Sequence, residues 1–209
     1  MFHAATAPST HTSALRSGHA NYIMRRFEVN TFLENIEKYK ITDLTLVPPV
    51  VVSIVMSPNP NKIKALSSVK AASTGGAPLN KIMQARFQEL LDPATPFTQI
   101  WAMTETSCLA SLFYYPENDD TGSVGRFIPN IDVKLVDDEG REITAYDVRG
   151  ELCVRGPGVI RGYLDNPEAN ARDFDEDGFF HTGDILYCDN KTKLWYIVDR
   201  KKVRYSRVY

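Results

Sequence analysis

Two short segments of the sequence carry aromatic, hydroxyl and acidic side chains at spacings that could support chemistry. In Gln99–Glu105, the ring of Trp101 offers a flat face for a base, and Thr104 and Glu105 supply a hydroxyl and a carboxylate for phosphate and Mg²⁺. In His181–Asp184 an acid follows a glycine, and a fixed carboxylate can accept two hydrogen bonds from a ribose diol. Each segment alone is more often structural, a helix-start cap or a surface turn. Together the two segments indicate a nucleotide-binding site.

Three further segments have a composition that allows either a ligand contact or a purely structural role. Ser73–Pro78 holds a glycine pair between a predicted strand and a predicted helix, where the backbone can approach a ligand closely or simply turn. The cluster Asp199–Lys202 could contact phosphate or ribose, or be a solvated strand end. Gly150–Gly156, followed by Gly162 and Tyr163, indicates a strand closed by glycines and a turn, with no chemistry of its own.

The elements that position the first segments alternate between strand and helix up to about residue 116. Asn30 is a candidate N-cap, and Pro48-Pro49 ends a buried strand and can open a helix. The expected helices are 30–40, 50–56 and 80–91, and the expected strands are 41–47, 69–73 and 97–100. This alternation is typical of a mostly parallel sheet covered by helices.

From about residue 117 to 202 the predicted elements are short strands separated by turns. Asp137–Gly140 is a good hairpin turn. The expected strands are 131–136, one near Glu142, 151–155 and 194–198. We therefore predict an α/β subdomain over 1–116, a β-rich subdomain over 117–202 and a tail over 203–209.

Composition narrows the class of protein and its partners. The 209 residues are 43% apolar and 11% aromatic, which suffices for a sizeable core. A net charge of −2 gives no reason to expect nucleic acid as a partner. The three cysteines are odd in number and widely spaced, which suits free thiols in a reducing compartment. The longest apolar run, residues 44–56, is too short for a membrane span, and residues 1–20 lack the apolar core of a signal peptide. We expect an intracellular protein, cytoplasmic or peroxisomal.

The order and spacing of these segments resemble the adenylate-forming acyl- and aryl-CoA ligases, the AMP-binding enzymes. The resemblance runs from residue 1 to about 202 and rests on Gly150–Tyr163, Thr182–Asp184 and Asp199–Arg200, with Gln99–Glu105 in place of the family's G-Y-G-M-T-E. The 4-coumarate-CoA-ligase-like branch of secondary metabolism is most similar. The resemblance implies ATP-dependent activation of a small carboxylic acid with Mg²⁺, through an acyl-adenylate, and transfer of the acyl group to coenzyme A.

The resemblance also assigns roles to individual residues. Thr104 and Glu105 stand where the family has a catalytic pair that contacts phosphate, with Glu105 reaching Mg²⁺ through the phosphate. The nucleotide would be contacted by Gly75, Gly76, Ala77, Pro78, Gln99, Trp101, Ala102, Met103, Thr104, Asp184 and Arg200. The acyl pocket would be lined by His3, Ser73, Gly75, Val124 and Gly125.

The implied fold is a partial N-terminal domain of an adenylate-forming enzyme, with a mostly parallel sheet, helices and a small β-barrel-like subdomain. The sequence departs from the family pattern at Ala102, where a glycine is usual. The family's phosphate-binding loop would lie upstream of His3, and its C-terminal lid with a catalytic lysine would follow Lys202. We therefore expect a chain truncated at both ends and inactive alone, with residues 203–209 matching no family segment.

Three alternatives stay open at this point. The chain could be a non-catalytic module that binds a nucleotide or acyl-adenylate, or pairs with a full-length relative. A separate, complementary chain could supply the missing parts. A fragment of a peptide-synthetase-type adenylation domain would share the same motifs. Which acid is activated, the compartment and the oligomeric state do not follow from the sequence.

Overall fold

The computed structural model describes residues 3–201, so the predicted tail over 203–209 and Lys202 lie outside the described residues. Contacts between Cα atoms divide the chain into two compact units. The first comprises the described residues up to Thr104 together with Cys108–Gly125, and the second comprises Glu105–Ser107 and the described residues from Arg126 onward.

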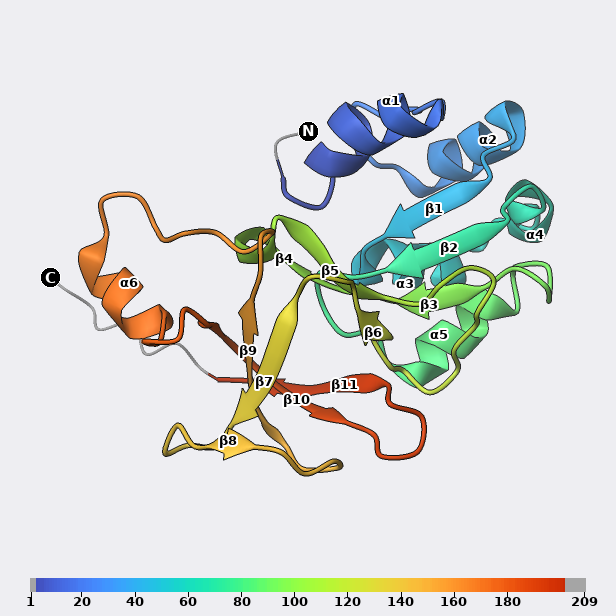
Figure 1. Ribbon diagram of the computed structural model, residues 1–209. Helices are drawn as coiled ribbons and strands as arrows, with labels where there is room; N and C mark the ends of the chain where they lie inside the picture. Colours follow the sequence, from blue (N-terminus) through green and yellow to red (C-terminus); the bar gives the residue numbers. More distant parts are fainter. Residues whose placement is uncertain (1–2, 202–209) are drawn as a thin grey trace, which may run out of the picture. The chain divides into compact units, whose positions relative to one another are not determined.

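The first unit is built on a three-stranded parallel sheet in the order β1-β2-β3, which confirms the predicted α/β class (Figure 1). The strands are β1 (Asp43–Leu46), β2 (Ala71–Thr74) and β3 (Phe97–Gln99). In the register, Thr74 pairs with Leu46 on one side and with Gln99 on the other. Because the strands are parallel, the segments that follow β2 and β3 leave the same edge of the sheet.

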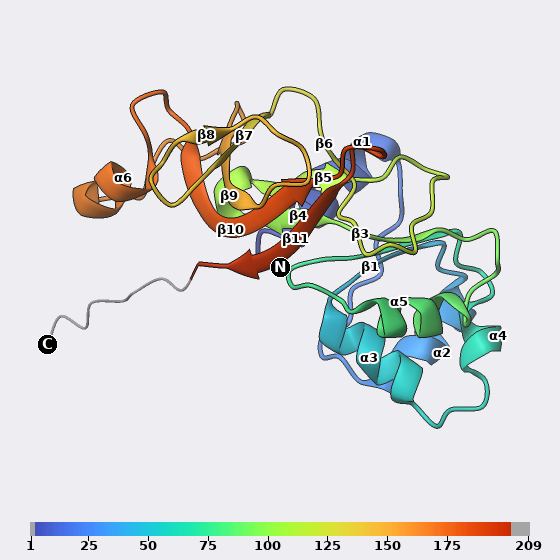
Figure 2. The same ribbon diagram turned by 90° about the horizontal axis from the view of Figure 1, so that it is seen from below.

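Four helices gather on one side of this sheet, as Figures 1 and 2 show together. They are α2 (Val29–Tyr39), α3 (Pro48–Met56), α4 (Lys62–Leu66) and α5 (Lys81–Gln88). The core lies between the helices and the sheet, with Phe87 of α5 against Phe97 of β3 at 4.5 Å between ring centroids. On β1, Leu44 and Leu46 are buried while the alternate residues are exposed, which is the pattern of a sheet with one covered face.

Local sequence explains where most of these helices begin. Pro48 and Pro49 open α3 as predicted, because the first helical positions need no backbone N–H donor. Asn80 caps α5 by accepting from the N–H of Met83 at 2.9 Å. The prediction of Asn30 as the cap of α2 is wrong. Glu28 caps this helix, and its carboxylate accepts from two backbone N–H groups at 3.0 and 2.7 Å.

An antiparallel hairpin that the sequence did not indicate follows the parallel sheet. It comprises β4 (Trp101–Met103) and β5 (Cys108–Leu112), with the short 3₁₀ helix η2 (Thr104–Thr106) between them. The segment mixes small and polar residues and lacks an alternating apolar pattern. The backbone N–H of Trp101 donates to the hydroxyl of Ser111 at 3.2 Å, across the hairpin.

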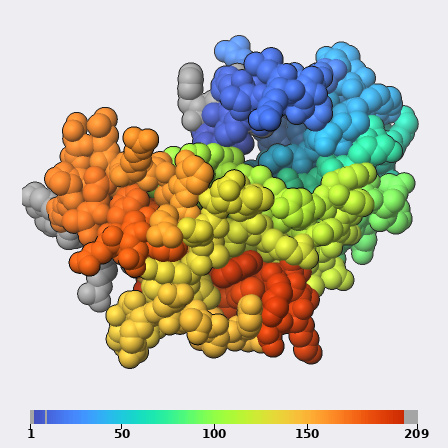
Figure 3. Space-filling view, viewed as in Figure 1, coloured from blue at the N-terminus to red at the C-terminus, as the bar shows by residue number. Residues whose placement is uncertain are grey.

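The N-terminal part of the first unit is a surface layer. A π-helical turn η1 (Ser9–Ser13) leads into α1 (Ala14–Ser17), seen in blue in Figures 1 and 3. Large apolar side chains are exposed here, with Leu15 at 80% and Ile23 at 60%, and elsewhere in the unit Ile82 is 71% exposed.

The second unit is a five-stranded antiparallel sheet in the order β11-β10-β9-β7-β8 (Figure 1). Its strands are β7 (Asp132–Val136), β8 (Glu142–Ile143), β9 (Gly150–Arg155), β10 (Phe180–Cys188) and β11 (Trp195–Arg200), and it also contains β6 (Arg126–Phe127) and α6 (Pro167–Asp173). The predicted hairpin turn joins β7 to β8. No helix among residues 3–201 is long and apolar enough to cross a membrane.

Candidate functional site

The loop after β2 contains two glycines, and each position favours glycine for a different reason. A Cβ on Gly75 would lie 2.6 Å from the Cγ1 atom of Ile100, so this glycine allows close packing against the continuation of β3. Gly76 has φ +84°, the left-handed region that glycine adopts at little cost. The hydroxyl of Thr74, just before the loop, is buried and has no hydrogen-bond partner within residues 3–201.

Gln99, predicted to contact a nucleotide, has a structural role at the end of β3. Its side-chain oxygen accepts from the N–H of Leu79 at 2.9 Å, and its side-chain nitrogen donates to the Leu79 carbonyl at 2.9 Å. The same nitrogen donates to the side-chain oxygen of Gln84 at 2.9 Å. Gln99 is only 4% exposed, so its amide anchors the segment that follows Gly76, Ala77 and Pro78. A nucleotide contact by Gln99 stays a prediction.

The predicted base-stacking residue is largely enclosed. Trp101 is 4% exposed in β4, and the next two residues, Ala102 and Met103, are partly buried. An indole with so little open surface offers a base only a small contact area. The stacking role of Trp101 therefore stays a prediction.

The predicted substrate loop at Val124 and Gly125 is held by buried polar groups. The Asp119 carboxylate accepts from the N–H groups of Gly122 and Ser123 at 2.9 and 3.1 Å. Gly125 has φ +80°, and a Cβ there would lie 2.1 Å from the carbonyl oxygen of Leu112. The loop is therefore packed directly on the end of β5.

Two predicted pocket residues, Ser73 and His3, are not fully buried. Ser73 is partly buried in β2, paired with Thr45 and Thr98. His3 is exposed, and its Nδ1 atom accepts from the N–H of Ala5 at 3.1 Å.

In the second unit, Glu105 is held by Tyr163. The phenol of Tyr163 donates to Oε1 of Glu105 at 2.9 Å, and the N–H of Ile160 donates to the Glu105 carbonyl at 2.8 Å. The side chain of Asn170 fixes the backbone of Tyr163 through bonds at 2.6 and 3.0 Å. Burial, then the hydrogen bond to Glu105, raise the pKa of Tyr163, so the phenol stays a donor at neutral pH.

This arrangement leaves Oε2 of Glu105 without a hydrogen bond in the described part of the chain. A partly buried carboxylate with one oxygen held and the other open suits a hard cation such as Mg²⁺. Within residues 3–201 no group of three acidic, histidine or cysteine residues could hold a metal ion by itself. Water or a bound phosphate would complete the coordination of a cation at Glu105. Sequence reasoning missed Tyr163 because its partner lies 58 residues away.

The structure brings together two residues predicted to contact the nucleotide, of which Asp184 is the one expected at the ribose. Asp184 of β10 pairs with Arg200 of β11, and Nε of Arg200 lies 3.4 Å from Oδ1 of Asp184. The Asp184 side chain is 12% exposed, and the Arg200 side chain is 67% exposed. A largely buried carboxylate beside an exposed guanidinium can bind a diol and an adjacent phosphate or ring.

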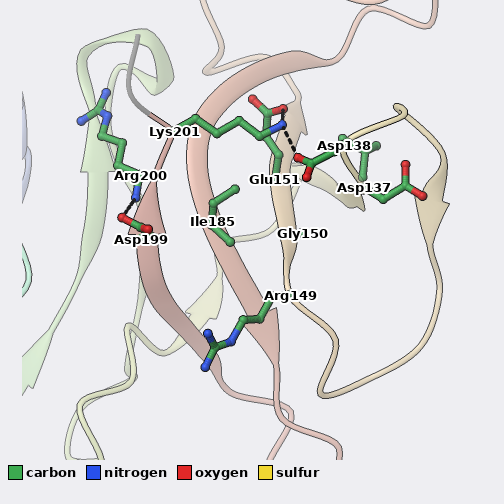
Figure 4. A pocket seen from close by; sticks show the side chains of 10 residues that line it. Asp137, Asp138, Arg149, Gly150, Glu151, Ile185, Asp199, Arg200 and Lys201 are labelled. Atoms are coloured by element: carbon green, nitrogen blue, oxygen red, sulfur yellow. Dashed lines mark hydrogen bonds and ion pairs between the residues drawn. The ribbon is translucent and has the colours of Figure 1, made fainter.

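A polar pocket of about 580 Å³ lies on the sheet of the second unit, shown in Figure 4. Lys201 crosses it, with its Nζ atom 3.1 Å from Glu151 and 3.4 Å from Asp138. The other residues that line it are Val136, Asp137, Arg149, Gly150, Ile185, Asp199 and Arg200. Arg200 thus belongs both to this pocket and to the pair with Asp184.

The predicted site residues divide between the two units. Those of the first unit are His3, Ser73, Gly75, Gly76, Ala77, Pro78, Gln99, Trp101, Ala102, Met103, Thr104, Val124 and Gly125. Those of the second unit are Glu105, Asp184 and Arg200. The three cysteines are free, as expected, and burial raises the pKa of the Cys153 thiol to about 12, which makes it a poor nucleophile.

Comparison with known proteins identifies the family. The model of the AMP-binding enzyme family matches residues 1–164, so the chain belongs to this family. It is 58% identical to an acyl-CoA synthetase from Alternaria alternata, over 97% of this chain and 35% of that protein. It is 52% identical to a phenylacetyl-CoA ligase from Aspergillus niger, over 97% of this chain and 38% of that protein.

The fold also matches solved structures of adenylate-forming enzymes. The structure of the O-succinylbenzoate coenzyme A synthetase from Bacillus subtilis, solved with ATP and a magnesium ion, matches 95% of this chain and 40% of its own length. The TM-score is 0.75 and the sequence identity 26%. The chain thus spans little more than a third of the length of the curated relatives it matches, 35% and 38% in the two cases above.

Proposed function

We propose that this chain is the nucleotide-holding part of an ATP-dependent acyl- or aryl-CoA ligase. Such an enzyme transfers the AMP moiety of ATP to a carboxylic acid with release of pyrophosphate, and then transfers the acyl group from the acyl-adenylate to coenzyme A. The observation that carries the proposal is the Asp184–Arg200 pair, at 3.4 Å, in a chain of the AMP-binding family. The names of the two fungal relatives support acyl and aryl acids as the substrate class.

Each site residue of the second unit has a separate role in this proposal. Asp184 accepts hydrogen bonds from the ribose hydroxyls, and Arg200 lies beside it to contact the nucleotide. Glu105 would reach Mg²⁺ through the bound phosphate, while Tyr163 holds Oε1 of its carboxylate in place. Bound Mg²⁺ and ATP would supply the activated phosphate and the charge neutralisation that such a transfer needs.

The first unit contributes backbone and small side chains. The loop Gly75–Pro78 lies against the adenine and part of the acid, and Thr104 donates to phosphate. Ser73, Val124 and Gly125 line the acid. Because ATP and coenzyme A are intracellular, the proposal places the protein inside the cell, in the cytoplasm or the peroxisome.

The test is equilibrium binding of AMP to the 209-residue chain by isothermal titration calorimetry. We expect one site, and a loss of affinity of about tenfold or more in D184N, because a charged acceptor for the ribose is removed. The matched control is D132N, since Asp132 is also a carboxylate paired with an arginine, Arg155 at 2.9 Å, on the same sheet. Absence of AMP binding by the unmodified chain, or equal loss in both variants, would contradict the proposal.

A further inference from the structure

The Thr-Gly-Asp segment forms a large bulge in the middle of β10. Pairing with β9 stops at His181, which faces Cys153, and resumes at Ile185, which faces Glu151. Three residues of β10 therefore oppose a single residue of β9, and the middle one, Gly183, has φ +72°. A bulge of this kind leaves backbone groups without their usual partners in the ladder.

The side chain of Glu151 replaces one of the missing ladder partners. Its Oε1 atom accepts from the N–H of Gly183 at 3.1 Å. On the other side, the N–H of Lys201 donates to the carbonyl of Gly183 at 2.7 Å. The hydroxyl of Thr182 also joins the bulge to β9 through the Leu152 carbonyl at 2.8 Å. The residue immediately before Asp184 is thus held at both its N–H and its carbonyl.

Glu151 is itself fixed from two directions. Its Oε2 atom lies 3.1 Å from Nζ of Lys201 and 3.4 Å from Nδ1 of His181, and its side chain is only 12% exposed. Figure 4 shows Lys201 reaching across the pocket to Glu151 and to Asp138. Burial alone would lower the pKa of Lys201, but the hydrogen bonds to the Glu151 and Asp138 carboxylates outweigh it and raise this pKa. The ammonium therefore stays charged beside Glu151 at neutral pH.

We propose that Glu151 is a positioning residue for the nucleotide, which acts by holding the Gly183 turn so that Asp184 faces the ribose. Without the carboxylate, the N–H of Gly183 loses its acceptor and the left-handed turn relaxes. Asp184 follows Gly183 directly, so its carboxylate would shift with the turn. The inference rests on the proposed function for the ligand and on the bulge geometry for the mechanism.

The experiment compares AMP with 2′,3′-dideoxy-AMP, which lacks the two ribose hydroxyls. We expect the unmodified chain to prefer AMP by about tenfold or more, the effect of lost hydrogen bonds to a charged group. In E151A this preference should fall to about threefold or less, while affinity for the dideoxy nucleotide changes little. In E151Q, whose amide oxygen can still accept from Gly183, most of the preference should return. The control E142A removes an exposed glutamate of β8 and should keep the preference in full.

A second measurement needs no nucleotide. Hydrogen exchange at the Gly183 amide should accelerate in E151A, stay slow in E151Q and be unchanged in D184N. If E151A does not fold, E151D replaces it, because the shorter side chain keeps the charge but does not reach Gly183.

The outcomes separate the two proposals. A chain that binds AMP and dideoxy-AMP equally would overturn the ribose role of Asp184 and, with it, the positioning role of Glu151. A full preference for AMP in E151A, or unchanged exchange at Gly183, would overturn the role of Glu151 alone.

Discussion

Replacing Gly125 by alanine should destabilise the first unit far more than the left-handed backbone conformation explains. Gly125 has φ +80°, and Gly76 in the same unit has φ +84°. The two glycines differ in their surroundings. A Cβ on Gly76 meets only Cγ1 of Val47 at 4.0 Å, whereas a Cβ on Gly125 would lie 2.1 Å from the oxygen and 2.4 Å from the carbon of the Leu112 carbonyl. G76A is therefore a matched control for the conformational cost.

The magnitude follows from these contacts. A left-handed alanine costs about 1–2 kcal/mol, offset by about 0.4–1 kcal/mol because alanine restricts the unfolded chain. G76A should thus lower the free energy of unfolding by roughly 1 kcal/mol. In G125A the end of β5 must also move to remove the clash, which adds about 1–3 kcal/mol. G125A should therefore cost about 2–4 kcal/mol in total.

The assay is urea unfolding followed by tryptophan fluorescence in a W195F background. The sequence has two tryptophans, Trp101 in the first unit and Trp195 in the second, so this background reports the first unit alone. Both glycine variants are compared in the same background, so the cost of W195F cancels. If G125A and G76A lower the free energy of unfolding equally, within about 0.5 kcal/mol, the close approach to Leu112 is not what requires glycine.

Two further predictions concern the second unit. Y163F removes the hydrogen-bond donor to Glu105. By calorimetry it should weaken binding of MgATP about tenfold and leave binding of AMP unchanged. An equal loss of affinity for both nucleotides would contradict a role of Tyr163 through the cation. For Asp175, burial opposes ionisation, but the hydrogen bonds from Lys134 at 2.6 Å and from the N–H of Phe179 lower its pKa below the ordinary 3.8. A carboxylate whose pKa is lowered on folding stabilises the folded state at pH values above its pKa in the unfolded chain. This stabilisation is lost as the pH falls through the pKa in the folded state. D175N should therefore cost about 1–2 kcal/mol at pH 7 and progressively less below pH 4 in urea titrations, and a constant cost would contradict this.

The parallel sheet was predictable because its strands and helices are apolar, periodic and separated by proline or glycine. Pro48 and Pro49 mark the start of α3, and Asp137–Gly140 marks the β7–β8 turn, by purely local chemistry. The strand β10 was missed for a physical reason. Its bulge interrupts a nine-residue strand with Thr-Gly-Asp, which has the composition of a loop.

The contacts between the site residues were harder to predict than the identity of those residues. The resemblance selects Asp184 and Arg200, and the structure places them 3.4 Å apart. No sequence pattern joins Tyr163 to Glu105, or Glu151 to Gly183, because these contacts depend on the register of the second unit's strands and loops. Gln99 is the opposite case. The motif selects it as a nucleotide contact, and in the structure its side chain is bonded to the backbone of Leu79.

The central claim is that this chain carries a nucleotide site of an adenylate-forming ligase. A thermal-unfolding scan with and without a non-hydrolysable acyl-adenylate analogue, an acyl-sulfamoyl adenosine, tests it most directly. A ligand that binds only the native state raises the unfolding temperature, and the rise grows with the logarithm of its concentration once that exceeds the Kd. We predict a cooperative transition that moves upward with the analogue and moves much less in D184N. An unfolding temperature that the analogue leaves unchanged at every concentration would contradict the claim.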